Sequence, residues 1–533
     1  MQIAIVHYHL NRGGVTQVIA NHLRSLSRAI DEGDRWRVLL IYGGRREGWP
    51  EDLPRACPQL EIARAEIPGL DYDDGDGGEG GRPDPSATAA QLASELLAAL
   101  RHHGFTPGET ILHVHNHALG KNVALPRLIE LLAPELGGTL LQIHDFAEDF
   151  RPELYLRLQT ALTPDHPERL PAVLYPQGSG VHYGVLNGRD RSILSKAGVA
   201  ATRLHWLPNP VAPFDGLPPR NVARRKLADH CQIAADTPLL LYPVRGIRRK
   251  NLGELLLWSA LADGAATLAV TLSPLNPTER GDYEAWRQLA AELDLNCRFG
   301  IGDSGGLGFA ENVAAADALM TTSVAEGFGM VFLEAWLAGR PLVGRNLPEI
   351  TGDFTEQGLR LDDMYDRLAI PLDWIGHDTF RQSLATTYAG VLRQYGRREA
   401  MPARFDEAFA ELVAGDDVDF GSLDIPLQRQ VLASICQSAV RRSELIERNA
   451  WFAEALTAND ENHRELVQQN RQVIENNYSL ERFGGRLRDL YVQILAEPRA
   501  SGPLQPPPAG EQILESFLQL KRLRPLRMNH LSA

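Results

Sequence analysis

Two glutamates on either side of a glycine turn form the most informative segment of this sequence. Glu326 and Glu334 are separated by seven residues, and Gly327-Phe328-Gly329 directly follows the first of them. The run 330–337 predicts a short apolar helix that a glycine and a proline end. Glycines let a backbone approach phosphate closely, the start of a helix offers N–H groups, and carboxylates accept hydrogen bonds from sugar hydroxyls. The segment is therefore typical of a site for a phosphorylated sugar donor.

Two cations follow a predicted strand in the middle of the chain. The strand 239–244 ends just before Arg245, a turn leads to Lys250, and a helix begins near Asn251. Fixed cations at a strand end could neutralise a diphosphate leaving group as its charge develops. A solvated basic loop is the alternative interpretation, because the two arginines between Arg245 and Lys250 inflate any count of cations.

A His-x-His-x-His run, His113 to His117, ends another predicted strand, and alternation places its three imidazoles on one face. No carboxylate or cysteine accompanies them at ligand spacing, so we do not expect a metal site. His115 and Asn116 are instead predicted to hydrogen-bond a hydroxylated substrate. His144 and Asp145 end the next strand and are predicted to contribute to the same region. A buried histidine with satisfied hydrogen bonds is the alternative for each.

The pair Gly13-Gly14 follows the first predicted strand and precedes a helix over residues 16–29. A tight turn at this point would let the start of the helix face a phosphate or an acceptor hydroxyl. Glycine pairs after a first strand are often only turns, so this motif alone leaves both interpretations open.

The composition excludes several classes of protein. The chain has 533 residues, of which 44% are apolar, and a formal net charge of −14. It can bury two or three cores. The charge argues against nucleic acid as a partner, and no apolar run of about 18 residues predicts a transmembrane segment. The cysteines are far apart, and the chain starts with a strand in place of a signal peptide. We therefore expect a cytoplasmic protein, with peripheral membrane contact left open.

Two stretches of the chain, residues 1–210 and 211–350, alternate short strands with helices. Such alternation predicts an α/β fold with two Rossmann-like, doubly wound parallel sheets, arranged as two domains facing a cleft. Residues 351–472 are expected to be mainly helical without a clear strand pattern, residues 473–496 to form one long helix, and residues 497–533 a tail. The expected strands are 3–8, 37–42, 110–115 and 139–144 in the first stretch, and 239–244, 266–272, 297–301 and 318–321 in the second.

Taken together, these motifs resemble those of family 4 glycosyltransferases, which are retaining, metal-independent enzymes of the GT-B fold. The resemblance covers residues 1 to about 350 and resumes near Asn476, where the family has a late helix that crosses back to the N-terminal domain. The motifs that carry it are Glu326 and Glu334 with the glycine turn between them, Arg245 with Lys250-Asn251, Gly13-Gly14, His144-Asp145 and Asn209-Pro210-Val211.

The resemblance implies a role for each motif. Glu334 would hold the nucleotide ribose, Glu326 would contact the donor sugar, and His144 would lie near the reacting sugar. Arg245 and Lys250 would clamp the diphosphate. The implied catalytic residues are Arg245, Lys250, Glu326 and His144. The implied donor-binding residues are Gly14, Gly327, Phe328, Gly329, Met330, Val331 and Glu334. The acceptor-binding residues are expected to be Gly13, His115, Asn116 and Asp145.

The implied reaction is the transfer of a hexose from a UDP- or GDP-sugar to a hydroxyl acceptor, with retention of configuration by attack on the same face. No metal or other cofactor is expected. A phosphorylase or epimerase on the same fold, and a non-catalytic scaffold that binds nucleotide sugars, are the alternatives. Assembly of several copies through the helical extension is left open.

Overall fold

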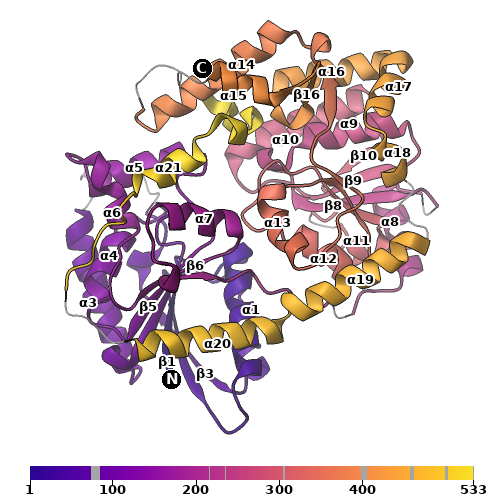
Figure 1. Cartoon of the computed structure of the whole chain (residues 1–533). Coiled ribbons are helices and arrows are strands. Elements are labelled where there is room, and N and C mark those ends of the chain that lie inside the picture. The colour runs from indigo at the N-terminus through magenta and orange to yellow at the C-terminus, as the bar shows by residue number, and fades with distance from the viewer. Residues whose placement is uncertain are drawn as a thin grey trace. The chain divides into compact units, whose positions relative to one another are not determined.

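The computed structural model describes residues 1–73, 84–214, 216–234, 236–303, 306–397, 405–456, 461–497 and 502–531. The chain divides into two compact units (Figure 1). Unit 1 contains residues 1–212, 394–397 and 476–518, and unit 2 contains residues 213–393, 398–475 and 519–533. Among the described residues, no helix is both long enough and apolar enough to cross a membrane.

The core of unit 1 is a seven-stranded parallel sheet in the order β3-β2-β1-β4-β5-β6-β7. The chain moves outward from β1 to β3 and then returns to place β4 on the other side of β1. The loops that follow β1 and β4 therefore lead away in opposite directions. Ligands of such sheets bind at this turning point, beyond the carboxyl ends of the two strands. The strands are β1 (Gln2–Val6), β2 (Trp36–Tyr42), β3 (Leu60–Glu66), β4 (Thr110–His115), β5 (Gly138–Ile143), β6 (Val181–Val185) and β7 (Leu204–Trp206).

Helices cover the sheet of unit 1 because the crossovers between its parallel strands are helical. The helices of this unit are α1 (Gly14–Ala29), α2 (Leu53–Ala56), α3 (Pro85–His102), α4 (Leu125–Leu132), α5 (Pro152–Leu162), α6 (Leu170–Leu174), α7 (Gly188–Lys196), α20 (Leu480–Ala496) and α21 (Glu511–Phe517). The expected strands of this stretch are confirmed to within two residues at each end, whereas β3, β6 and β7 were not expected.

Unit 2 repeats the same topology in a six-stranded parallel sheet, with the order β10-β9-β8-β11-β12-β13. Its chain also moves outward, from β8 to β10, and returns to place β11 beside β8. The strands are β8 (Leu239–Arg245), β9 (Thr267–Leu272), β10 (Cys297–Phe299), β11 (Ala318–Thr321), β12 (Leu342–Arg345) and β13 (Met364–Tyr365). The helices are α8 (Arg220–Cys231), α9 (Leu252–Ala262), α10 (Pro277–Glu292), α11 (Phe309–Ala315), α12 (Val331–Leu337) and α13 (Pro348–Glu356).

The region after α13 is mainly helical, as expected, but it also contains a small antiparallel sheet, β14-β16-β15. The expectation that this region lacks strands is therefore wrong. Its strands have two or three residues each, too few to show alternation in a sequence. They are β14 (Ala369–Pro371), β15 (Val413–Ala414) and β16 (Asp417–Asp419). The helices are α14 (His377–Gln394), α15 (Phe405–Leu412), α16 (Ile425–Gln437), α17 (Ala439–Arg448), α18 (Trp451–Leu456) and α19 (Glu461–Asn477).

A buried ion network attaches this helical region to the sheet of unit 2. The guanidinium of Arg345, at the end of β12, donates to Glu254 on α9 and to Asp419 on β16. Arg345 and Glu254 are 3% and 0% exposed, respectively. Removing Arg345 would leave the carboxylates of Glu254 and Asp419 without this cation, so the network fixes β16 against the sheet.

The single long helix expected over residues 473–496 is instead two helices. α19 ends at Asn477, and α20 begins after Ser479, whose side chain accepts a hydrogen bond from the amide of Arg482 at its start. A serine in this position caps a helix because its oxygen satisfies an otherwise unpaired N–H. The apolar face of α20, which includes Phe483, Leu487 and Tyr491, joins the hydrophobic core formed by β1, β2 and α1.

Two neighbouring glycines on α20 provide a matched test of this packing. A Cβ at Gly484 would lie 2.0 Å from the backbone oxygen of Ser25 on α1, whereas a Cβ at Gly485 would meet nothing within 4 Å. We expect Gly484→Ala to lower the free energy of unfolding by about 1–3 kcal/mol, because the two helices must separate. Gly485→Ala is expected to raise it by about 0.5–1 kcal/mol through helix propensity. Denaturant unfolding of both variants measures the difference, and equal effects would contradict the close contact of α1 and α20.

Candidate functional site

The loops that follow β8 and β11 contact each other at the turning point of the sheet in unit 2. The amide of Val324, after β11, donates to the carbonyl of Arg249, after β8, at 2.9 Å. The hydroxyl of Thr322 donates to the carbonyl of Lys250 at 2.8 Å. These bonds bring together the two motifs that the sequence placed 70 or more residues apart.

The carboxylate of Glu326 lies at the centre of this contact and is 8% exposed. It accepts hydrogen bonds from Lys250 Nζ, from the guanidinium of Arg249 and, at 2.6 Å, from Ser323 Oγ. Burial by itself would raise the pKa of Glu326, but the charges of Arg249 and Lys250 outweigh it and hold this pKa at about 2. Burial lowers the pKa of Lys250 to about 8, against the opposing effect of Glu326. Both groups are therefore ionised at neutral pH.

Arg245 does not join this cluster, although the sequence paired it with Lys250. Its side chain is exposed, and Nη1 donates to the carbonyl of Ser273 at 3.1 Å. Arg249, which the sequence interpretation counted as part of a basic loop, occupies the position beside Glu326. Spacing alone could not distinguish the arginines, because the short turn Arg248–Lys250 decides which side chain points inward.

The glycine turn after Glu326 prepares the start of α12. Gly329 has a φ of +83°, a conformation that favours glycine, and a Cβ there would lie 2.6 Å from the ring of Phe332. Phe328 is buried against the ring of Phe354, with the centroids 5.3 Å apart. The amides of Gly329, Met330 and Val331 donate to no group among the described residues, so they are available to an anion.

Glu334 lies in the first turn of α12, and burial raises its pKa to about 7. In the described part of the chain, no hydrogen bond or ion pair reaches its carboxylate. Its environment therefore contrasts with that of Glu326, whose charge is balanced by two cations. A half-buried carboxyl without a partner is suited to accept hydrogen bonds from the hydroxyls of a ligand.

In unit 1, Gly13 and Gly14 end the loop after β1 and are exposed at the start of α1. Gly13 is extended, with φ −174°, and a Cβ on Gly14 would meet nothing within 4 Å. Packing among the described residues does not require glycine at position 14. The expectation that it lets a ligand approach the backbone stays a prediction.

The loops after β4 and β5 are held together by Asn116. Its Oδ1 accepts from the amides of His144 and Asp145 at 2.7 and 3.1 Å, and its φ is +58°. The Asp145 carboxylate accepts from Arg151 at 2.5 Å. Two of the residues predicted to bind an acceptor therefore form the frame that places His144.

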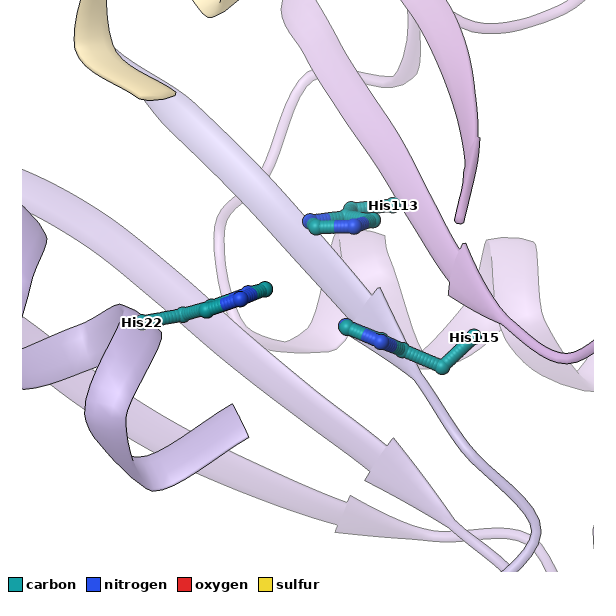
Figure 2. A group of neighbouring side chains, drawn as sticks. All are labelled: His22, His113 and His115. Atoms are coloured by element: carbon teal, nitrogen blue, oxygen red, sulfur yellow. The ribbon is translucent and has the colours of Figure 1, made fainter. Parts of the chain in front are cut away.

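Figure 2 shows an arrangement of histidines that the sequence only partly indicated. His113 and His115 project from the same face of β4, with ring centroids 4.3 Å apart, and His22 reaches them from α1. His22 was missed, although its place on the buried face of the helix 16–29 was a usable signal. The expectation that His117 shares this face is wrong, because β4 ends at His115 and the His117 ring instead bonds the carbonyl of Leu174 at 2.7 Å.

Ring nitrogens of His22, His113 and His115 lie within 4.8 Å of one another. Both nitrogens of His113 are hydrogen-bonded, to Tyr491 and Gln142, at 2.7 and 2.9 Å. The rings of His113 and His115 are stacked, at 26° to each other, which does not direct their lone pairs at one point. A metal would require these rings to rotate, and metal independence stays a prediction.

No family model matches the chain. The mannosylglucosyl-3-phosphoglycerate synthase of Petrotoga mobilis is 25% identical over 377 residues, which are 69% of this chain and 69% of that protein. The sucrose-phosphate synthase of Thermosynechococcus elongatus is 16% identical, with a TM-score of 0.52 over 93% of this chain and 100% of that one. A glycosyltransferase from Rickettsia africae is 12% identical, with a TM-score of 0.53 over 93% and 98%.

The chain has the fold of the GT-B glycosyltransferases. Its two Rossmann-like units and its helical C-terminal part confirm the expected fold class, and both neighbours align over nearly all of this chain. Membership of family 4 and the role of each site residue stay predictions.

The buried histidines of unit 1 predict acid sensitivity. Burial lowers the pKa of His7 and His113 to about 3 and of His117 and His144 to about 4. Below pH 6.5 these histidines become protonated in the unfolded chain but stay neutral in the folded chain. The free energy of unfolding therefore falls as the pH falls towards 4. Each such histidine contributes about 1.4 kcal/mol per pH unit.

Denaturant unfolding at pH 7.5 and 5.5 measures this loss. His117→Gln is expected to remove the contribution of one histidine from the pH dependence of the free energy of unfolding. The new amide can still donate to the carbonyl of Leu174, but it cannot titrate. His102→Gln, on the exposed end of α3, is the control and is expected to change nothing. A free energy of unfolding that is independent of pH over this range would contradict the burial of these imidazoles as neutral rings.

Proposed function

We propose that this protein is a retaining glycosyltransferase that moves a hexose from a nucleoside-diphosphate sugar to a hydroxyl acceptor. The observation that carries the proposal is the cluster of Lys250, Arg249 and Glu326 at the turning point of the sheet in unit 2. The cations of this cluster, together with amides at 329–331 and a Glu334 carboxyl that have no partner in the described part of the chain, meet the chemical needs of a diphosphate, a ribose and a sugar.

In the proposed reaction, Lys250 Nζ keeps donor capacity beyond its bond to Glu326 and faces the diphosphate. We also propose that Arg245, which lies outside this cluster and has an exposed guanidinium, faces the diphosphate as an additional cation. The bond from the anomeric carbon to the diphosphate breaks first, and the charge that develops on the leaving oxygen is stabilised by these cations. The acceptor hydroxyl attacks from the face that the diphosphate leaves, and its proton passes to the leaving phosphate. The configuration is therefore retained.

Within this proposal, Arg249 holds Glu326 in position. One nitrogen of its guanidinium donates to both the carboxylate of Glu326 and the carbonyl of Ala325. Glu326 is then left with a fixed orientation in which it can accept hydrogen bonds from hydroxyls of the transferred hexose. No metal is needed, because the cations of the chain neutralise the leaving group.

The name of the Petrotoga enzyme gives the acceptor class to test first. That enzyme is a synthase of a disaccharide joined to 3-phosphoglycerate. We propose by analogy a small, anionic glycoside as the acceptor of this chain. Thermal shift with UDP, GDP, ADP and their hexose conjugates would identify the donor. NMR of the product would then report the linkage, and inversion at the anomeric carbon would overturn the retaining mechanism.

Lys250→Ala is expected to lower kcat/KM for the donor by roughly 30- to 900-fold, which corresponds to about 2–4 kcal/mol of lost charge stabilisation. Lys226→Ala is the control, since Lys226 lies on the surface of the same unit and pairs only with Glu311 in the described chain. For Lys250→Ala we expect both the rate of hexose transfer and the affinity for UDP or GDP to fall. Equal activity of the two variants would remove Lys250 from the site.

Metal independence is tested on the same assay. We expect 5-fold or smaller changes in turnover on adding Mg²⁺ or an excess of EDTA, because Lys250 and its arginine neighbours supply the positive charge. Activity that is abolished by EDTA and restored by Mg²⁺ would contradict this part of the proposal. Formation of a sugar phosphate from a glycoside and inorganic phosphate, without nucleotide, would show that the protein is a phosphorylase and would contradict the proposed transferase activity.

A further inference from the structure

A direct hydrogen bond between two imidazoles joins the end of β4 to the loop after β5 in unit 1. His115 Nδ1 and His144 Nε2 are 2.8 Å apart. His115 is fully buried and His144 is 6% exposed. Burial lowers the pKa of both rings, and His113, His22 and His7 lie near enough to add to the effect on His115. Both imidazoles are therefore neutral at pH 7, and a single proton lies between the two nitrogens.

The second nitrogen of His115 decides which ring carries that proton. His115 Nε2 is buried and has no hydrogen-bond partner among the described residues. If His115 accepted at Nδ1, its own proton would sit on Nε2 as a buried N–H without an acceptor. Buried N–H groups without an acceptor are rare in folded proteins, because the donor loses its bond to water and gains none in return. If His115 instead donates from Nδ1, only a lone pair is left unpaired at Nε2, which is tolerated more often than a buried N–H without an acceptor.

We infer that His115 fixes His144 in the tautomer that carries its proton on Nδ1, so that His144 presents a hydrogen-bond donor at the carboxyl end of β5. His144 accepts from His115 at Nε2, which leaves Nδ1 as its only protonated nitrogen. Among the described residues, Nδ1 of His144 has no hydrogen-bond partner. This atom is also not fully enclosed by protein, in contrast to Nε2 of His115. The donor is therefore accessible to a ligand.

The inference names a positioning residue for the reaction, and in that respect it rests on the proposed function. A neutral N–H donor recognises an oxygen lone pair, as on a sugar hydroxyl or a phosphate, and it cannot act as a base towards the acceptor hydroxyl. Proton removal then falls to the leaving phosphate. His115 never touches the substrate and acts through the orientation and the proton of His144.

The tautomer itself can be measured without any substrate. Long-range ¹H–¹⁵N spectra of the full-length protein with ¹⁵N-labelled histidine distinguish a protonated from an unprotonated ring nitrogen, and His144→Gln assigns the signals. We expect a protonated Nδ1 and an unprotonated Nε2 for His144. The reverse pattern would overturn the inference whatever the protein catalyses.

A double-mutant cycle tests the catalytic consequence, with UDP-glucose or GDP-mannose as donor, whichever the screen above identifies. His115→Leu is expected to lower kcat at least tenfold, and to have no further effect in a His144→Leu background. His115→Asn is expected to retain activity within about threefold, because its amide N–H takes the place of Nδ1–H. His117→Leu, on the neighbouring stretch and without contact to His144, is expected to add to His144→Leu independently.

Additive effects of His115→Leu and His144→Leu would overturn the positioning role. Loss of activity in His115→Asn equal to that in His115→Leu would do the same. If the wild type turns over none of the hexose conjugates in the screen, the proposed function fails, whereas the spectra still decide the tautomer.

Discussion

The bond between buried Lys250 and Glu326 is the interaction on which the arrangement of unit 2 depends. Burying either charge alone would cost several kcal/mol. The pair is tolerated because Ser323 adds a second donor to Oε1 of Glu326, which Lys250 also bonds, and Arg249 donates to Oε2. The bond also joins the loops after β8 and β11, which diverge at the turning point of the sheet. The same charges that hold these loops together therefore stand where an anionic ligand would bind.

Unit 1 meets the same topological constraint with different chemistry. Its turning point lies between β1 and β4, and the groups gathered near it include several neutral imidazoles. Neutral rings can be buried at lower cost than ions, provided that their nitrogens find partners, as His113 does with Tyr491 and Gln142. One unit thus offers fixed positive charge and the other offers oriented hydrogen-bond donors.

Much of the fold could be predicted, because parallel strands buried on both faces give continuous apolar runs. β4, β8 and β11 were expected within a residue of their observed ends. Two of the three missed strands of unit 1, β3 and β7, depart from this pattern for physical reasons. β3 is partly exposed and carries charged residues, and β7 is only three residues long. The break between α19 and α20 depends on one capping serine in an otherwise continuous amphipathic pattern, so the hydrophobic period did not reveal it.

The sequence by itself determined the fold class and the segments that hold the candidate site, because chemical types and spacing survive in a linear pattern. It indicated Glu326, Glu334 and Lys250 through the glycine turn and the cation that follows a strand. Only the tertiary structure decided that Arg249, and not Arg245, lies against Glu326, since one short helical turn sets the direction of each side chain. Only the tertiary structure brought His22 from α1 to His115 and joined His115 to His144. Contacts between separate elements depend on how the sheet orders its strands, and no local pattern records that order.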